Sequence, residues 1–254
     1  MPRRPGLKNN DRISHLVDIA GLDLNYIKND NDQIRIGAAT NINAIGAFVQ
    51  FLSGPYRALS EAAEAHSTPT IKNRATVGGN LCNASACADL ALPFQVLNAV
   101  LVAAGTNGER QLAIAEFFKG PNYTDLRIDE VLMEICIPQF SDKAGSSFVK
   151  LRRQQTDIDM AVANVATFLL CNQGRCETAR IALGAVGPIS FRAQRAESML
   201  AGEKITEKTI QKAASTAAGE ASPIDDIRAT AAYRRKMVAV LVRRSLETSL
   251  RRCG

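Results

Sequence analysis

Two β-rich segments joined by a very short turn place the strongest constraint on how this chain can fold. Residues 161–170 form an almost wholly apolar run, and residues 179–188 form a second run that closes with a Gly-Pro pair. Between them lies the segment 171–176, Cys-Asn-Gln-Gly-Arg-Cys. Runs of this kind on both sides of a short Asn/Gly turn predict an antiparallel hairpin.

The rest of the chain predicts a mixture of strands and helices. Alternating apolar residues predict strands at 33–38, 131–137 and 147–151, whereas helical patterns and caps predict helices at 44–52, 56–65, 193–200, 207–219 and 229–250. The polar segment 141–146 separates two halves, and we place a domain boundary there. The predicted fold class is α+β.

Composition indicates a globular protein that stays in water. The 254 residues are 46% hydrophobic and 22% charged, and no apolar run approaches the twenty or so residues of a spanning helix. The basic start is followed by polar residues where a signal peptide would be apolar, so we expect a cytoplasmic protein. The six cysteines are then expected to be free thiols, although Cys171 and Cys176 could pair across the turn.

The formal charge of +6 is concentrated at the C-terminal end. Eight basic and two acidic residues lie from Asp226 onward, so this segment alone accounts for the net charge. On a helix, Arg234 and Arg243 would point to opposite sides, which gives no continuous basic stripe. Only 5% of residues are aromatic and none is Trp, so we expect partner docking or simple solvation instead of nucleic-acid binding.

The segment 76–89 concentrates small and hydrogen-bonding residues. Paired glycines let backbone N–H groups approach an anion, and Asn, Ser and Thr side chains can surround a phosphate or ribose. A carboxylate could accept hydrogen bonds from ribose hydroxyls. The alternative is a tight turn with a helix cap, because the spacing matches neither known glycine-rich nucleotide motif. The candidate binding residues here are Thr76, Val77, Gly78, Gly79, Asn80, Asn83, Ser85 and Asp89.

Short stretches in consistent order along nearly the whole chain resemble one family. They are Leu16–Ile19, Ile34–Ala38, Ile71–Asn80, Ala84-Ser85, Ala88–Leu90, Glu116–Phe118 with Gly120, Ile135–Pro138, Phe148–Arg153, Ala179–Gly184, Tyr233–Arg235 and Val240–Arg244. Together they resemble the flavin-binding subunit of the molybdenum hydroxylases, the group that includes carbon monoxide dehydrogenase and xanthine dehydrogenase.

The resemblance implies an α+β fold in two parts. Residues 1–140 would form an FAD-binding domain of the PCMH type, similar to that of vanillyl-alcohol oxidase, with its first lobe incomplete. Residues 145–254 would form a C-terminal domain like that of carbon monoxide dehydrogenase flavoproteins, an antiparallel sheet with three helices. Relatives carry an Ala-Gly-Gly-Thr/His loop before the segment that matches Leu16–Ile19, and the fifteen residues before Leu16 hold no such loop.

The resemblance also implies roles for the candidate residues. Thr76, Gly78 and Gly79 would contact the FAD pyrophosphate, with Val77, Asn80 and Ser85 in the same binding segment. Asn83 and Asp89 would face the phosphate or ribose region. Lys150 would lie near the isoalloxazine ring, where a cation stabilises the anionic reduced flavin and raises its potential. The alternative for Lys150 is a surface lysine at a strand end.

The implied function is electron transfer, with no catalytic residue and no metal site on this chain. FAD would pass electrons between iron–sulfur clusters and an external acceptor. Molybdopterin and [2Fe-2S] clusters would reside on a large and a small partner subunit. An iron–sulfur cluster needs four ligands, and no insert beside Cys82 and Cys87 supplies the other two. His15 and His66 are too few and too scattered to suggest a metal site. The alternative is a non-catalytic assembly subunit that has lost FAD binding.

Overall fold

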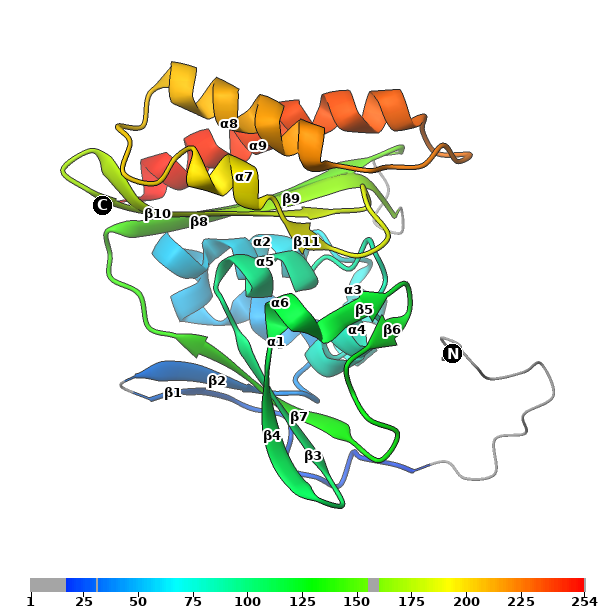
Figure 1. Ribbon diagram of the computed structural model, residues 1–254. Helices are drawn as coiled ribbons and strands as arrows, with labels where there is room; N and C mark the ends of the chain where they lie inside the picture. The colour runs from blue at the N-terminus through cyan, green and yellow to red at the C-terminus, as the bar shows by residue number, and fades with distance from the viewer. Residues whose placement is uncertain (1–16, 31, 155–159, 254) are drawn as a thin grey trace.

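The computed structural model describes residues 17–30, 32–154 and 160–253 and shows two large sheets, each with helices beside it, and a small two-stranded ribbon (Figure 1). From the C-terminal helices downward in Figure 1, the layers alternate helix, sheet, helix, sheet. Residues up to 140 supply the lower sheet and its helices, and residues from 144 onward supply the upper ones. His15, Leu16 and the start of the chain, where we expect no signal peptide, lie outside the described residues.

The lower sheet has five strands, and every neighbouring pair is antiparallel. In β2, Ile34 and Ile36 are fully buried, whereas Gln33 and Arg35 lie on the opposite face, as the two-residue period of a strand requires. The strands predicted at 33–38 and 131–137 are therefore confirmed. In spatial order the strands are β1 (Ile27–Asn29), β2 (Gln33–Gly37), β7 (Val131–Pro138), β3 (Val100–Gly105) and β4 (Gly108–Ala113).

Short helices cover the inner face of this sheet. The helix predicted at 56–65 is confirmed, and the segment 69–74 forms a further helix for which we made no prediction. The elements are α1 (Ile42–Ala47), α2 (Arg57–Glu64), α3 (Pro69–Arg74), α4 (Val77–Cys82), α5 (Ala91–Val96) and α6 (Ile114–Phe117), with 3₁₀ turns η1 (Val49–Leu52) and η2 (Gly54–Tyr56) and a ribbon of β5 (Phe118–Gly120) and β6 (Tyr123–Thr124).

The helix predicted at 44–52 is shorter than expected. Asn41 caps α1 as the sequence suggests, with its side chain accepting a hydrogen bond from Ala44 N at 2.8 Å. The α-helix nevertheless ends at Ala47, because Phe48 adopts an extended conformation (φ −70°, ψ 119°). That break brings the Phe48 ring edge-on to Phe51, with centroids 4.9 Å apart, and the chain continues as η1.

The upper sheet is built around the predicted hairpin. Its turn residues Gln173 (φ 50°) and Gly174 (φ 77°) both have positive φ, as in the turns that suit the twist of a hairpin. Cys171 and Cys176 are direct cross-strand partners, and both are free thiols, so no disulfide spans the turn. In spatial order the strands are β11 (Phe191–Arg192), β10 (Arg175–Gly184), β9 (Ala161–Asn172) and β8 (Ala144–Arg152).

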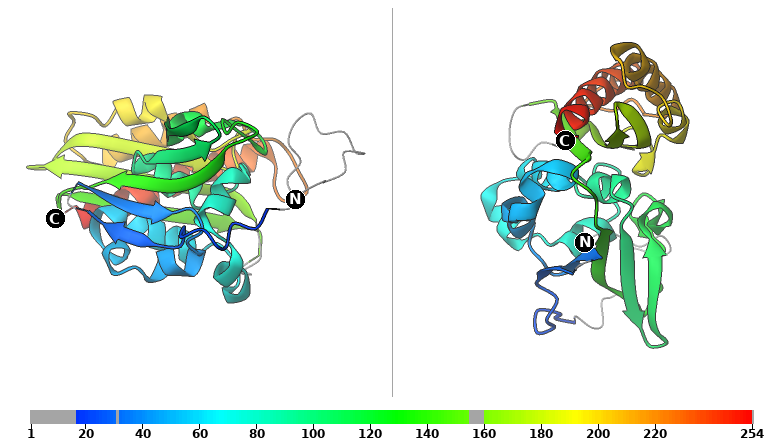
Figure 2. Two further views of the ribbon diagram at one scale, coloured as in Figure 1. Left: turned by 90° about the horizontal axis from the view of Figure 1, so that it is seen from below. Right: turned by 90° about the vertical axis from the view of Figure 1, so that its left-hand side faces the viewer.

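The three predicted C-terminal helices lie on one face of the upper sheet (Figure 2). They are α7 (Gln194–Ser198), α8 (Glu207–Glu220) and α9 (Ala231–Arg252). Thr206 and Thr230 cap the last two helices, and their side chains accept from the N–H groups of Thr209 and Tyr233. No helix in the part of the chain that the structure describes is long and apolar enough to cross a membrane.

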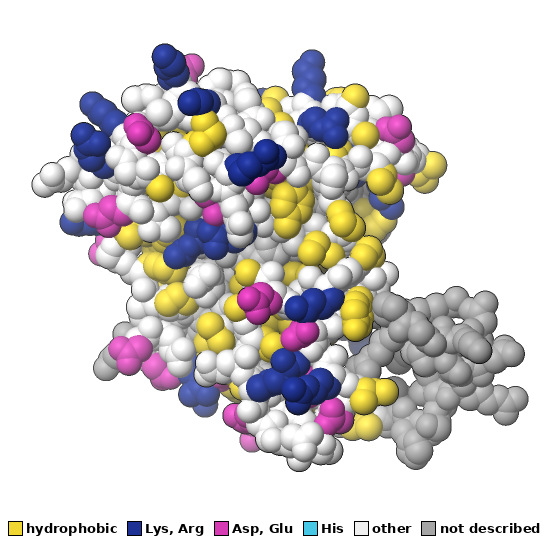
Figure 3. All heavy atoms as spheres, viewed as in Figure 1, with side chains coloured by type: hydrophobic (Ala, Val, Ile, Leu, Met, Phe, Trp, Pro, Cys, Tyr) yellow, Lys and Arg dark blue, Asp and Glu magenta, His cyan; other side chains and the backbone are white. Residues whose placement is uncertain are grey.

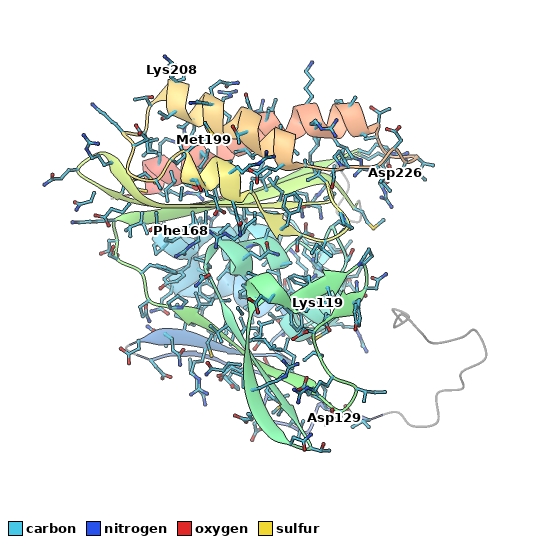
Figure 4. The ribbon with its side chains drawn as sticks, in the orientation of Figure 1. Lys119, Asp129, Phe168, Met199, Lys208 and Asp226 are labelled. Atoms are coloured by element: carbon cyan, nitrogen blue, oxygen red, sulfur yellow. The ribbon has the colours of Figure 1, made fainter. Side chains whose placement is uncertain are left out.

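The helices of the N-terminal half also cover the second face of the upper sheet. Phe148 of β8 and Phe168 of β9 belong to the same buried core as Leu59 of α2 and Phe94 of α5. Figure 4 shows Phe168 at the junction between the upper sheet and these helices. The two halves therefore share a core, which holds residues of β8 and β9 against the segments that precede and follow α4.

Charged side chains fasten the end of α9 to the N-terminal half. Arg252 Nη2 lies 2.6 Å from Glu61 Oε1 of α2, and Arg252 Nη1 donates to Ser146 O at 2.7 Å. The second oxygen of Glu61 accepts from Phe148 N at 2.8 Å. One carboxylate of α2 thus holds both β8 and α9.

The basic residues of α9 serve different purposes, as the opposite placement of Arg234 and Arg243 predicts. Arg234 is 3% exposed and donates to Val162 O and Ala185 O, and it pairs with Asp226 at 2.7 Å. Arg243 pairs with Glu247 nearer the surface. In the space-filling view, Lys and Arg over the C-terminal helices are interspersed with acidic and apolar side chains (Figure 3).

The close crossing of α9 over β8 depends on Gly145. A Cβ at this position would lie 2.2 Å from Ser249 O and 2.8 Å from Arg252, so Gly145→Ala forces the helix away from the strand. We expect the free energy of unfolding to fall by about 1–3 kcal/mol in a denaturant titration. The matched control is Gly219→Ala in α8, where a Cβ meets nothing within 4 Å and alanine favours the helix. Equal stability of the two variants would contradict this packing.

Candidate functional site

The glycine-rich segment begins α4, and its backbone donors are engaged within the protein. Thr76 caps the helix, as its position before the first helical residue suggests. The acceptors are Thr40 O for Val77 N (2.9 Å), Ala38 O for Gly78 N (2.8 Å), Thr76 Oγ1 for Gly79 N (3.0 Å) and Thr76 O for Asn80 N (2.9 Å). The first N–H groups of α4 therefore have acceptors within the protein, and contact of the paired glycines with an anion stays a prediction.

The two glycines differ in what surrounds them. A Cβ on Gly78 would lie 2.8 Å from both Cβ and O of Ala38, so this glycine allows α4 to pack against the end of β2. Gly79 is exposed, and a Cβ there would meet only Thr76 Oγ1, at 3.0 Å. Gly79 is consequently the position at which a ligand can approach the backbone closely.

Asp89 and Lys150, predicted from opposite halves of the chain, form a buried ion pair. Lys150 extends from β8, and Asp89 lies just before α5; Lys150 Nζ is 2.8 Å from Asp89 Oδ2, and each side chain is 4% exposed. Lys150 also donates to Ala65 O at 3.2 Å. The reading of Lys150 as a surface lysine is therefore wrong.

The carboxylate of Asp89 is surrounded by protein groups. Its Oδ1 accepts from Asn164 Nδ2 of β9 at 3.2 Å, while Oδ2 accepts from Lys150. Both oxygens of Asp89 thus have donors within the protein, and Asp89 holds Lys150 and Asn164 in place. A carboxylate can accept further hydrogen bonds, so its acceptance of ribose hydroxyls stays a prediction.

Asn83 and Ser85 lie on the segment that joins α4 to Asp89. Asn83 is the C-cap of α4 and donates its N–H to Gly79 O at 3.1 Å, and Ser85 Oγ lies 3.2 Å from Cys87 Sγ. Among the described residues, neither one forms a hydrogen bond or ion pair with Asp89 or Lys150. Asn83 and Ser85 therefore lie along the chain between the glycine turn and Asp89.

Two residues of the site were missed in the sequence. His66 follows α2, and its Nδ1 lies 3.4 Å from Asp89 Oδ2; we had set it aside as one of two scattered histidines. Asn164 is fully buried in β9. A signal for Asn164 exists, because it is a polar residue in the middle of the apolar run 161–170. No local signal singles out His66.

Some buried polar atoms of the candidate residues and of their neighbours have no hydrogen-bond partner within the described residues. Among the described residues, five buried side-chain atoms are unpaired, and three of them belong to His66 (Nδ1), Asn80 (Oδ1) and Asn164 (Oδ1). Asn164 Oδ1 lies against Gly184 of β10, where an added Cβ would be 2.3 Å away, so this atom faces the backbone of the sheet. Buried polar atoms are satisfied in the large majority of cases, so the unpaired atoms of His66 and Asn80 are the ones that can receive a polar ligand. Together with the open backbone at Gly79, these atoms fit a cofactor that carries phosphate, hydroxyl and heterocyclic polar groups.

A cavity of about 630 Å³ lies elsewhere, on the outer face of the five-stranded sheet, and none of the predicted residues lines it. Its buried centre is Glu134, which accepts hydrogen bonds from Tyr26 Oη, from Arg35 Nε at 2.9 Å and from Cys136 Sγ at 3.3 Å. Burial, then the hydrogen bond and charge of Glu134, raise the pKa of Tyr26 to about 12. The polar groups at the centre are thus paired with one another, and we do not assign this cavity as the site.

The comparisons with known proteins identify the family. Residues 6–140 match the family model described as FAD binding domain in molybdopterin dehydrogenase, and residues 146–249 match the CO dehydrogenase flavoprotein C-terminal domain. The carbon monoxide dehydrogenase medium chain of Hydrogenophaga pseudoflava is 30% identical over 241 residues, which cover 94% of this chain and 83% of that one. The medium chain of Afipia carboxidovorans is 32% identical over 235 residues, covering 92% and 80%.

Solved structures agree with the sequence relatives. The structure of carbon monoxide dehydrogenase from Hydrogenophaga pseudoflava aligns with a TM-score of 0.86 and 31% identity, covering 91% of this chain and 79% of that chain. Quinoline 2-oxidoreductase from Pseudomonas putida 86 aligns with a TM-score of 0.82 and 28% identity, covering 90% and 78%. The fold is that of an FAD-binding domain followed by a flavoprotein C-terminal domain. The chain belongs to the FAD-binding medium subunits of the molybdenum hydroxylase family.

The buried ion pair predicts a coupled effect of two substitutions. Asp89→Asn leaves the Lys150 ammonium buried without a counter-charge, and Lys150→Met leaves the carboxylate alone, so each single variant should lose about 3–5 kcal/mol of unfolding free energy. The double variant removes both charges and should be more stable than either single variant. Denaturant titrations of all four proteins measure this coupling. Additive losses would show that the two charges do not interact.

The Tyr26 pKa predicts an alkaline stability loss. The neutral phenol is favoured in the folded state, where its pKa is about 12, over the unfolded chain, where the pKa is 10.0. This contribution is fully present below pH 10 and is lost as the pH rises to about 12. We expect Tyr26→Phe to flatten the fall in unfolding free energy across that interval. Tyr123→Phe, at a half-exposed tyrosine, is the control that should leave the profile unchanged.

Proposed function

We propose that this chain binds FAD at the junction of its two halves and passes electrons between the iron–sulfur clusters of a partner subunit and an external acceptor. The observation that carries the proposal is the buried cluster of Asp89, Lys150 and Asn164, which lies where α5, β8 and β9 meet and has the unpaired Nδ1 of His66 beside it. In this proposal residues 1–140 are the FAD-binding domain and residues 145–254 the C-terminal domain.

The glycine turn and the segment after it would hold the diphosphate and ribose end of the cofactor. The exposed backbone at Gly79 offers close approach, and the Asn80 amide has an unpaired oxygen. Since the first N–H groups of α4 already have acceptors, we assign contacts in this region to side chains and exposed backbone. The residues we propose for contact at this end are Thr76, Gly79, Asn80, Asn83 and Ser85, while the buried Val77 and Gly78 support the turn from the core side.

Lys150 would serve the ring end of the cofactor, with Asp89 holding it in place. An ammonium group has three donors, and Lys150 uses two of them on Asp89 Oδ2 and Ala65 O. The third is available to an acceptor on a ligand. Because both side chains are 4% exposed, water screens this charge weakly, and its effect on a neighbouring group is larger than at the surface.

FAD supplies the redox chemistry when bound, since it can exchange electrons one or two at a time. The chain's own residues bind it, orient it and set the charge around it. Relatives are named as the medium chain or as one subunit of a dehydrogenase complex. By analogy we propose two partners here, a large subunit with the molybdenum cofactor and a small subunit with [2Fe-2S] clusters, with the substrate bound on the large one.

The visible absorption spectrum of the chain, purified alone and with its co-encoded partners, tests the proposal. We expect flavin absorption and about one FAD per chain. Gly79→Arg places a long side chain at the open backbone and should abolish FAD retention while leaving the fold intact by circular dichroism. Gly219→Arg on the exposed side of α8 is the matched control and should keep its FAD.

Two outcomes would contradict the proposal. A colourless protein in both preparations would favour the alternative of an assembly subunit without FAD. Unchanged flavin content in Gly79→Arg would show that the glycine turn is not part of the site.

A further inference from the structure

The segment 84–89, which follows the glycine turn, has a backbone conformation that its own residues do not favour. Ala84 is left-handed (φ 47°), a conformation that residues other than glycine rarely adopt. Its carbonyl accepts a hydrogen bond from Asn122 N at 3.0 Å, and the carbonyl of Ala86 accepts one from Ala185 N at 2.7 Å. The segment is therefore held in shape by hydrogen bonds from distant parts of the chain.

Ala185, the second of these donors, is itself left-handed (φ 59°). It follows the last residue of β10, and the pairing of β10 with β9 ends at Gly184 and Asn164. The turn at Ala185 directs its N–H to Ala86 and its carbonyl to Arg234. Residues other than glycine persist in this conformation only where the surrounding structure holds them, and such positions cluster at functional sites.

Arg234 of α9 holds the carbonyl of Ala185 in place. Its side chain is 3% exposed, and Nη1 donates to Ala185 O at 2.9 Å and to Val162 O at 2.8 Å. Nη2 lies 2.7 Å from Oδ1 of Asp226, in the loop that leads from α8 to α9 (Figure 4). A buried charge is costly unless its hydrogen bonds are made, so these three acceptors fix the guanidinium and the two carbonyls on it.

Both carbonyls on Arg234 lead to the candidate flavin site. Val162 lies on β9 two residues before Asn164, whose amide donates to Asp89 Oδ1. Ala185 binds the backbone of the segment that ends at Asp89. Among the described residues, the hydrogen-bond partners of Arg234 include no candidate cofactor residue. Its effect on the site therefore has to pass through these two backbone groups.

We propose that Arg234 is a positioning residue for the flavin site, which it affects through Ala185 by fixing the segment that carries Ser85 and Asp89. The inference rests on the proposed function and adds to it a residue of the last helix. With Arg234 in place, the segment has its binding conformation before the cofactor arrives. Without it, Ala185 relaxes to an ordinary conformation and its N–H leaves Ala86. The affinity for FAD then falls in proportion to the fraction of molecules whose segment is still in place.

The affinity for FAD tests this proposal in the full chain, purified with its co-encoded partners and freed of flavin. Arg234→Met removes the guanidinium and keeps the length of the side chain. In folded protein it should raise the Kd for FAD about tenfold. Arg243→Met, which breaks a pair nearer the surface of the same helix, is the control and should keep the wild-type Kd.

A second substitution separates positioning from simple support of the fold. Glycine adopts the left-handed conformation without steric cost, so Ala185→Gly added to Arg234→Met should restore most of the affinity. If Arg234 only stabilised the protein, the folded variant would bind FAD as tightly as the wild type. Wild-type affinity in folded Arg234→Met, or a loss that Ala185→Gly leaves unchanged, would overturn the inference.

Ala185→Val tests the same step while Arg234 keeps its partners, which covers the case in which Arg234→Met does not fold. A β-branched residue does not tolerate the left-handed conformation, so this variant should also raise the Kd for FAD. Gln173→Val is the matched control, because Gln173 has the same backbone conformation (φ 50°) in the hairpin turn at the other end of β10. Wild-type affinity in Ala185→Val would overturn the inference.

Amide hydrogen exchange of the chain without FAD tests the backbone step directly. The amide protons of Ala185 and of Ala88, which donates to Ser85 O at 3.0 Å, should exchange about ten times faster in Arg234→Met than in the wild type. Those of β3 in the lower sheet should be unchanged. Equal exchange at Ala185 and Ala88 would overturn the inference. Absence of FAD binding by the wild type would instead contradict the proposed function, and the exchange rates would still decide whether Arg234 fixes this segment.

Discussion

The buried ion pair of Asp89 and Lys150 is the interaction on which the arrangement of this site depends. Removing two charges from water is costly, and mutual attraction repays that cost only when the remaining donors and acceptors are also matched. Here Asn164 and Ala65 O supply part of that matching. Because the pair joins the segment before α5 to β8, the geometry of the site requires the two halves of the chain to keep a fixed position relative to each other.

The shared helical layer keeps the two halves in this relative position. Helices of the N-terminal half pack against one sheet on each side, so that Phe148 and Phe168 of the upper sheet lie in the same core as Leu59 and Phe94. Glu61 adds polar contacts by holding both Phe148 N and Arg252. Apolar packing alone would fix the spacing between the layers. The directional hydrogen bonds also fix how far one layer is displaced along the other.

The candidate residues, which lie close together in the sequence, have different roles in the structure. Gly78 is needed for packing against Ala38, whereas Gly79 leaves the backbone open. Asp89 holds Lys150, with both of its oxygens engaged inside the protein. The unpaired atoms of His66 and Asn80 can receive a polar ligand, which agrees with the membership of this chain in a flavin-binding family.

The sequence by itself determined the local elements and the family. The hairpin at 161–188, the strand at 33–38 and the three C-terminal helices follow from periodicity and turn residues, because those signals depend on neighbours a few positions away. The end of α1 at Ala47 does not follow from these signals, because it depends on the packing of Phe48 on Phe51. Only the tertiary structure decided that Asp89 and Lys150, 61 residues apart, share a buried contact, and that His66 and Asn164 join them. No local pattern reports such a meeting, because it results from the packing of four separate segments around one core.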